Sequence, residues 1–119
     1  MENKLSYWAA PIVLYKKDVT RIKTDNIIED VCKVYQIELT DLMSSRRFRE
    51  LVEPRQVLFY ILHKKLKIKS TKVGKMFNKN HATVLHGSNN IQNWMENDKE
   101  LKERVNGVMI RNDYFGLLK

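Results

Sequence analysis

The chain has 119 residues, of which 43% are hydrophobic, a length and composition that fit one domain with a single core and exclude a largely disordered chain. It carries 22 basic and 14 acidic residues, a formal net charge of +8, and no apolar run approaches the roughly 18 residues of a membrane span. The single cysteine, Cys32, excludes a disulfide framework and favours a reducing compartment. The N-terminal sequence lacks the pattern of a signal peptide, so we expect a cytoplasmic protein.

The positive charge is concentrated in the middle of the chain. Residues 44–83 contain eleven basic residues and only two acidic ones, Glu50 and Glu53, whereas the rest of the chain is close to neutral. Such a concentration is typical of a surface that binds a polyanion. A basic face that contacts only solvent is the alternative that composition leaves open.

The N-terminal third combines an unclear segment with a predicted helix. Residues 1–23 are interpreted as an N-terminal arm of unknown role, and their apolar part, 1–15, is a candidate for self-association or for a protein partner. From Thr24 the spacing becomes helical, with Thr24 or Asn26 as the cap and one apolar face made by Ile27, Ile28, Val31, Val34 and Tyr35. A short helical turn is predicted next, directing inward Leu39, Leu42 and Met43.

The central third predicts two further helices. Pro54 is expected in the first turn of a helix, where its missing N–H costs nothing, and the apolar positions of that helix are Val57, Leu58, Ile61, Leu62 and Leu66. Ser70 or Thr71 is the expected cap of the following short helix. The side chains of that helix that are expected to face the core are Val73, Met76 and Phe77.

The C-terminal third predicts a longer helix and a final amphipathic one. Asn80 is a favourable N-cap for a helix over 81–95, with a core stripe of Val84, Leu85, Ser88, Ile91 and Met95. A last helix is expected over about 98–109, facing the core through Leu101, Val105 and Val108. Residues 111–119 are interpreted as a C-terminal tail.

These elements predict an all-α fold, a compact bundle of about six helices. Two of them, over 70–77 and 81–95, are joined by a three-residue polar turn, which is the helix-turn-helix arrangement. The second helix of that motif enters the major groove with its N-terminus first, and Asn80, His81 and Thr83 are short polar groups that can reach base edges there. Capping by Asn80 alone is the plain alternative for the same residues.

The combined motifs carry a resemblance to a known family. "PRQVLFYILHKKL" and "KVGKMFNKNHATVLHGSNNI", with "IELTDLMSSRRFRE" upstream, resemble the C-terminal DNA-binding domain of the bacterial replication initiator DnaA. The similarity extends over about residues 25–109, so that a domain over 24–110 is expected. A prokaryotic or phage-encoded protein is implied.

The resemblance implies a mode of DNA binding. Arg47 would enter the minor groove beside the major-groove site, with electrostatic support from Arg46 and Arg49. Base edges would be contacted by Asn80, His81 and Ala82. Phosphates would be contacted by Arg55, Gln56 and Thr83, and charge and position add Lys72, Lys75 and Lys79.

Several positions depart from the family pattern. Asn80 replaces the family's aspartate, Ala82 replaces a hydroxyl residue, and Asn89 and Asn90 stand where basic residues are usual. The turn is one residue shorter and lacks the family's glycines. The base preference is therefore expected to differ from that of the initiator's usual box.

Catalytic and cofactor chemistry is not expected. The only candidate phosphate loop, "KIKSTKVGKM", lacks the first glycine and the hydroxyl residue after the lysine, so neither nucleotide binding nor enzymatic activity is predicted. His63, His81, His86 and Cys32 lack the spacing of metal ligands. We expect His86 and Cys32 at or near the core, and Trp94 in packing.

The predicted function is sequence-specific binding of double-stranded DNA in replication initiation or its regulation. The alternative is a protein-interaction or transcription-regulatory module that kept the fold and lost the reading of the origin box, as Ala82, Asn89 and Asn90 suggest. Binding of structured RNA through the same basic surface is a third possibility.

Overall fold

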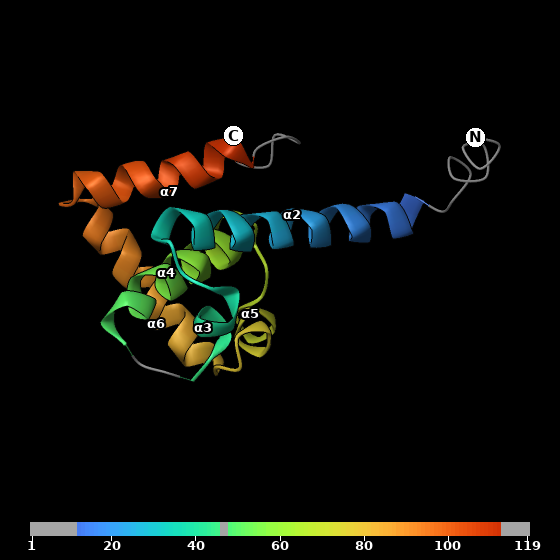
Figure 1. Ribbon diagram of the computed structural model, residues 1–119. Coiled ribbons are helices and arrows are strands. Elements are labelled where there is room, and N and C mark those ends of the chain that lie inside the picture. The colour runs from blue at the N-terminus through green and yellow to red at the C-terminus, as the bar shows by residue number, and fades with distance from the viewer. Residues whose placement is uncertain (1–11, 46–47, 113–119) are drawn as a thin grey trace.

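The computed structural model describes residues 12–45 and 48–112, and within these ranges every regular element is a helix, with no strands (Figure 1). The elements in order are α2 (Ile12–Tyr35), α3 (Leu39–Met43), α4 (Arg49–Phe59), the π-helical turn η1 (Tyr60–Lys65), α5 (Ser70–Met76), α6 (His81–Met95) and α7 (Lys99–Arg111). The predicted all-α bundle is confirmed. Among the described helices, none combines the length and the hydrophobicity that a membrane-spanning segment requires.

Helix α2 is longer than the sequence pattern predicted. It begins at Ile12, twelve residues before the expected start at Thr24, and passes without a break through the proposed end of the N-terminal arm. The prediction that Thr24 or Asn26 caps a helix is therefore wrong. The apolar face was correctly predicted, since Ile27 and Val31 are fully buried.

Helix α4 begins earlier than predicted and changes its hydrogen-bonding register at its end. Its first residue is Arg49, so Pro54 lies inside the helix and not in its first turn. Proline has no N–H, so it cannot donate to the carbonyl of Glu50 one turn before it. The helix still forms there because Pro54 is buried together with Leu51, Arg55 and Val57. After Phe59 the helix widens into η1, the kind of π-helical turn that is frequent at functional sites.

The core lies where α2, α4, η1, α5, α6 and α7 meet. The predicted core positions of α4 and η1 are confirmed, because Val57, Leu58, Ile61 and Leu62 are almost fully buried. Cys32 is also buried, and its pKa is raised by burial and by the nearby Glu29 and Glu38. Leu39 is an exception: its side chain is 49% exposed, because the five-residue α3 buries only Leu42 fully.

A close backbone contact fixes the angle between α5 and α6. The carbonyl of Gly74 accepts hydrogen bonds from the backbone N–H groups of Phe77 (3.2 Å) and Lys79 (2.7 Å), which closes the turn. Asn78 has φ +57°, a conformation that asparagine tolerates better than most residues. A Cβ atom at Gly74 would lie 2.4 Å from the Lys79 carbonyl oxygen, so only glycine allows this approach.

Aromatic packing against α4 also stabilises the turn. Phe77 is 3% exposed, and its ring meets that of Phe59 edge to face with the centroids 5.5 Å apart. On the other side, a Cβ at Gly87 of α6 would lie 2.8 Å from Cδ2 of Phe59. Helix α6 therefore packs closely on α4, and its first turn is held at one end of the bundle.

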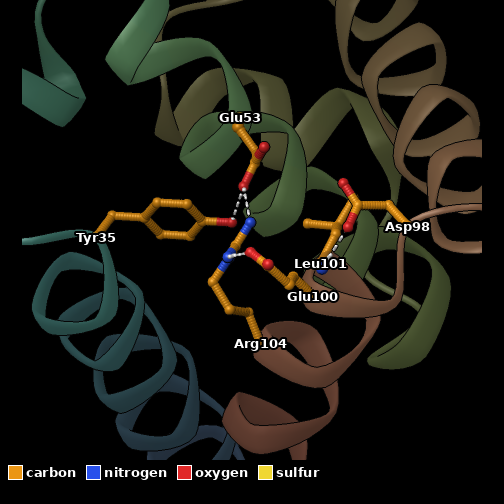
Figure 2. Close-up of polar contacts among 6 residues, drawn as sticks. All are labelled: Tyr35, Glu53, Asp98, Glu100, Leu101 and Arg104. Atoms are coloured by element: carbon orange, nitrogen blue, oxygen red, sulfur yellow. Dashed lines mark hydrogen bonds and ion pairs between the residues drawn. The ribbon is translucent and has the colours of Figure 1, made fainter.

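A polar cluster joins three helices at the other side of the core (Figure 2). The hydroxyl of Tyr35 on α2 donates to Oε2 of Glu53 on α4 (2.5 Å), and Nη2 of Arg104 on α7 donates to the same oxygen (3.2 Å). The Arg104 guanidinium also stacks over the Tyr35 ring and pairs with Glu100. Burial and the hydrogen bond to Glu53 raise the pKa of Tyr35.

Gly74→Ala is expected to destabilise the fold by about 1–3 kcal/mol, because the new methyl group meets a backbone carbonyl that cannot move without opening the turn. Gly107→Ala on α7 is the matched control. Its methyl would meet only the flexible end of Arg111 at 3.1 Å, so unchanged stability or a gain of up to about 1 kcal/mol is expected. Urea unfolding of the three proteins measures both changes, and equal stabilities for the two variants would refute the steric account of the turn.

Tyr35→Phe is expected to cost about 1 kcal/mol at neutral pH, through the lost hydrogen bond to Glu53. Because the pKa of Tyr35 is higher in the folded state than its ordinary value of 10.0, its contribution is complete below that value and declines as the pH rises above it. Unfolding free energies of the wild type and Tyr35→Phe should therefore converge above about pH 10. A constant difference from pH 7 to 11 would contradict this assignment.

Candidate nucleic-acid interface

The first turn of α6 is exposed and capped by its own side chains. Oδ1 of Asn80 accepts hydrogen bonds from the backbone N–H of Thr83 (2.8 Å) and from its hydroxyl (3.0 Å). The predicted N-cap is thereby confirmed. His81 and Ala82 are exposed beside it, and the N–H groups of a helix's first turn have no partner within the helix.

This cap limits what each side chain can offer to a ligand. Both lone pairs of the Asn80 amide oxygen are engaged, so its NH₂ group is left to donate outward, whereas bidentate pairing with adenine needs the oxygen as well. The Thr83 hydroxyl gives its hydrogen to Asn80. Thr83 can donate to a phosphate only by breaking that bond, while His81 keeps both ring nitrogens available for base edges.

The exposed face of α6 is wider than predicted. The buried side is made of Val84, Gly87, Ser88 and Ile91, and the Ser88 hydroxyl donates to the Val84 carbonyl (2.8 Å). Leu85 is 38% exposed, so the prediction that it belongs to the core stripe is wrong. His86 is also exposed, whereas it was expected at or near the core. Because Gly87 and Ser88 are small, α6 lies so close to α4 that the side chains of Leu85 and His86 are left at the surface. Trp94, expected in packing, is 43% exposed.

Arg55 is used inside the fold. Its side chain is buried, its Nε donates to the Leu42 carbonyl (2.9 Å), and its Nη2 donates to the carbonyls of Asp41 (3.0 Å) and Ser44 (2.7 Å). Burial lowers the pKa of the guanidinium. This placement does not fit the predicted phosphate contact. Arg55 instead fixes the end of α3, just before the arginine loop, which we define as residues 45–49.

Gln56 is partly engaged with α6. Its Oε1 accepts a hydrogen bond from Nδ2 of Asn90 (2.9 Å), and its own NH₂ group can still donate to a phosphate. The contact explains one of the departures from the family pattern, because Asn90 ties α6 to α4 where a basic residue is usual. The phosphate contact of Gln56 stays a prediction.

The remaining predicted residues lie on α4, on α5 and in the turn after α5. Lys72 and Lys75 are exposed on α5, Lys79 is half-buried in the turn, and Arg49 is exposed at the start of α4. Arg46 and Arg47 lie outside the described residues. In Figure 1, α3, α5 and the first turn of α6 occupy the same lower end of the molecule.

Sequence reasoning missed one cation beside α6. Nζ of Lys64 in η1 donates to Oδ1 of Asn89 (2.7 Å) and to Oε1 of Gln92 (2.6 Å). The only signal in the sequence was the pair of asparagines at 89 and 90, but a regular helix over 54–66 would not have predicted which lysine faces them. Within the described ranges, no group of three or more His, Cys, Asp or Glu side chains could hold a metal ion.

A short helix, a tight turn and a second helix with an exposed polar tip define a helix-turn-helix protein. The sequence profile of the bacterial DnaA protein helix-turn-helix matches residues 24–91. The chain therefore belongs to the bacterial DnaA helix-turn-helix family.

Similar proteins are chromosomal replication initiator proteins DnaA. Those of Rickettsia canadensis (strain McKiel) and Rickettsia massiliae (strain Mtu5) are 42% identical to this chain over 90 residues, and that of Rickettsia akari (strain Hartford) is 41% identical. The matched region covers 74% of this chain and 19% of each relative. The chain thus spans about a fifth of the length of these curated relatives.

Asn80→Ala is expected to lower the unfolding free energy by about 1 kcal/mol, because the first turn of α6 loses its cap. Asn80→Asp keeps a carboxylate oxygen as the acceptor and should retain the stability of the wild type. Thermal or urea unfolding of both variants measures the change. Equal losses in the two variants would show that the side chain contributes something other than the cap.

Proposed function

We propose that this chain binds double-stranded DNA, with the first turn of α6 in the major groove. The observation that carries the proposal is the exposure of His81 and Ala82 beside the capped Asn80, in the first turn of α6, directly after the turn that the Gly74 carbonyl closes. A helix-turn-helix reads bases through these first residues. Membership of the DnaA family supports the same docking.

The electrostatics of the central segment support a duplex partner. Lys72, Lys75 and Lys79 border the turn and the tip of α6, and charges at this end can neutralise phosphates on either side of the groove. The N-terminus of α6 adds a partial positive charge directed at the same place. Affinity should therefore come mainly from phosphate contacts and should fall steeply with salt.

Base preference is assigned to the tip of α6 and to the arginine loop. Asn80 in its capping conformation offers donors, which suits base acceptors such as N7 and O6, and Ala82 offers a methyl group. Arg47 is proposed to enter the adjacent minor groove with support from Arg46 and Arg49. Arg55 contributes indirectly, because it binds the carbonyls that lead into this loop.

Replication initiation or its regulation is the process proposed for this binding. The relatives are named as chromosomal replication initiators, and the matched region is their helix-turn-helix. The replacements at Asn80, Ala82, Asn89 and Asn90 argue for a duplex preference of its own. A selection of bound duplexes from a random library would identify that preference.

His81→Ala and Arg47→Ala are each expected to cost about 1–3 kcal/mol of binding free energy against the selected duplex and less against unrelated duplex. Lys72→Ala should weaken binding to both duplexes equally, because a phosphate contact carries no sequence information. Fluorescence anisotropy at fixed salt measures all three variants. An unchanged preference in His81→Ala, or tight binding to a protein with no affinity for any duplex, would contradict the proposed function.

A further inference from the structure

We propose that η1 and the loop after it form a second phosphate-binding surface, built from Lys64, Lys67 and Lys69, which holds the backbone of the same duplex beside the C-terminal half of α6. The inference rests on the proposed function and assigns it three contacts that neither the helix-turn-helix motif nor the arginine loop supplies. We name this set the η1 surface. Its position follows from three observations.

The first observation is the placement of Lys64. Its ammonium group bonds to the side-chain oxygens of Asn89 and Gln92, both on the exposed half of α6. These partners are neutral amides, so they orient the ammonium group without neutralising it. A positive charge therefore lies against α6, two to three turns after its tip, where the helix itself carries no basic residue.

The second observation is an open hollow next to this charge. It has a volume of about 410 Å³ and is lined by His63, Lys64, Lys67, Ile68 and Lys69. Nδ1 of His63 lies 2.8 Å from the Ile68 carbonyl oxygen and must carry the hydrogen of that bond. The backbone of Lys67 has φ +64°, which reverses the chain so that Lys64 and Lys69 border the same hollow.

The third observation is that these lysines form no ion pair with another described residue. Among the described residues, the ion pairs involve Glu53, Glu100 and Asp30, and no carboxylate pairs with a lysine of the η1 surface. Cations at the end of a helix can serve merely to complement its dipole. That role does not account for Lys64, whose ammonium group bonds to side chains of another helix.

The geometry of a duplex brings a backbone to this place. The major groove is about 12 Å wide, and a helix with its side chains is about 10–12 Å across, so the two sugar–phosphate strands pass directly along its flanks. Lys64 marks one flank of α6 because it is anchored to Asn89 and Gln92. A strand on that flank would meet Lys64 first and then the hollow with Lys67 and Lys69.

Lys65 provides a matched control within the same turn. Its Nζ lies 5.6 Å from the centroid of the Tyr60 ring, and it does not line the hollow. We therefore compare three variants that make the same lysine-to-glutamine change at different positions: Lys64→Gln, Lys65→Gln and the double variant Lys67→Gln/Lys69→Gln. Binding to the selected duplex is measured by anisotropy over a salt series, and contacted phosphates are mapped by ethylation interference.

Lys64→Gln should lower the affinity for the selected duplex about two- to fivefold. The double variant should lower this affinity by about the same factor for each of its two lysines. The slope of log affinity against log salt should become shallower by about 0.9 for each lost contact. The preference for the selected duplex should not change, and interference should disappear at the phosphates beside α6 while it persists at those near its tip. Lys65→Gln should behave as the wild type.

Wild-type affinity, salt slope and interference pattern in Lys64→Gln and in the double variant would overturn this inference. If His81→Ala still loses its preference in that case, the proposed function stands without the η1 surface. If the wild type binds no duplex at all, the proposed function fails and the inference fails with it. Melting temperatures of the glutamine variants show whether a loss of binding arises from unfolding. The double variant changes only exposed lysines in a loop, so it still tests the inference if Lys64→Gln proves less stable.

Discussion

The contact between Gly74 and the backbone at Lys79 is the constraint on which the binding surface depends. A missing side chain lets α5 and the turn approach within backbone contact, and the Gly74 carbonyl binds the N–H groups that follow. The result is an α6 whose first residues point away from the bundle while its later residues pack on α4. A helix tip aimed by backbone contacts cannot adapt freely, so its few side chains can discriminate between bases.

Rigidity at the tip is matched by ties elsewhere in the bundle. The cluster of Tyr35, Glu53 and Arg104 joins α2, α4 and α7 (Figure 2). A second tie is made by the carboxylate of Asp30 on α2, which binds both Arg111 and Asn112 at the end of α7. These groups belong to α2, α4 and α7, whereas the residues proposed to meet bases in the major groove belong to the start of α6. Most polar interactions that stabilise the fold are therefore made by other residues than those proposed to bind DNA. Arg55 and Gln56 are exceptions, because they hold the end of α3 and the middle of α6 beside the proposed interface.

The sequence predicted what periodicity and capping control. Asn80 as an N-cap, the apolar faces of α2 and α7, and the buried residues of α4 follow from local spacing and are confirmed. Patterns failed where tertiary packing decides. Pro54 lies inside a helix because burial outweighs one lost hydrogen bond, and Leu85 and His86 are exposed because Gly87 narrows the buried side of α6. The widening at η1, which brings Lys64 to Asn89, has no signal in periodicity at all.

Amide chemical shifts measured by NMR during titration with the selected duplex show whether the first turn of α6 meets its bases. We expect the largest shift changes at His81, Ala82 and Thr83, and smaller changes along α5. The amides of α7, on the opposite side of the bundle in Figure 1, should move little. Large changes confined to α2 and α7, with the first turn of α6 unaffected, would show that α6 does not meet the duplex.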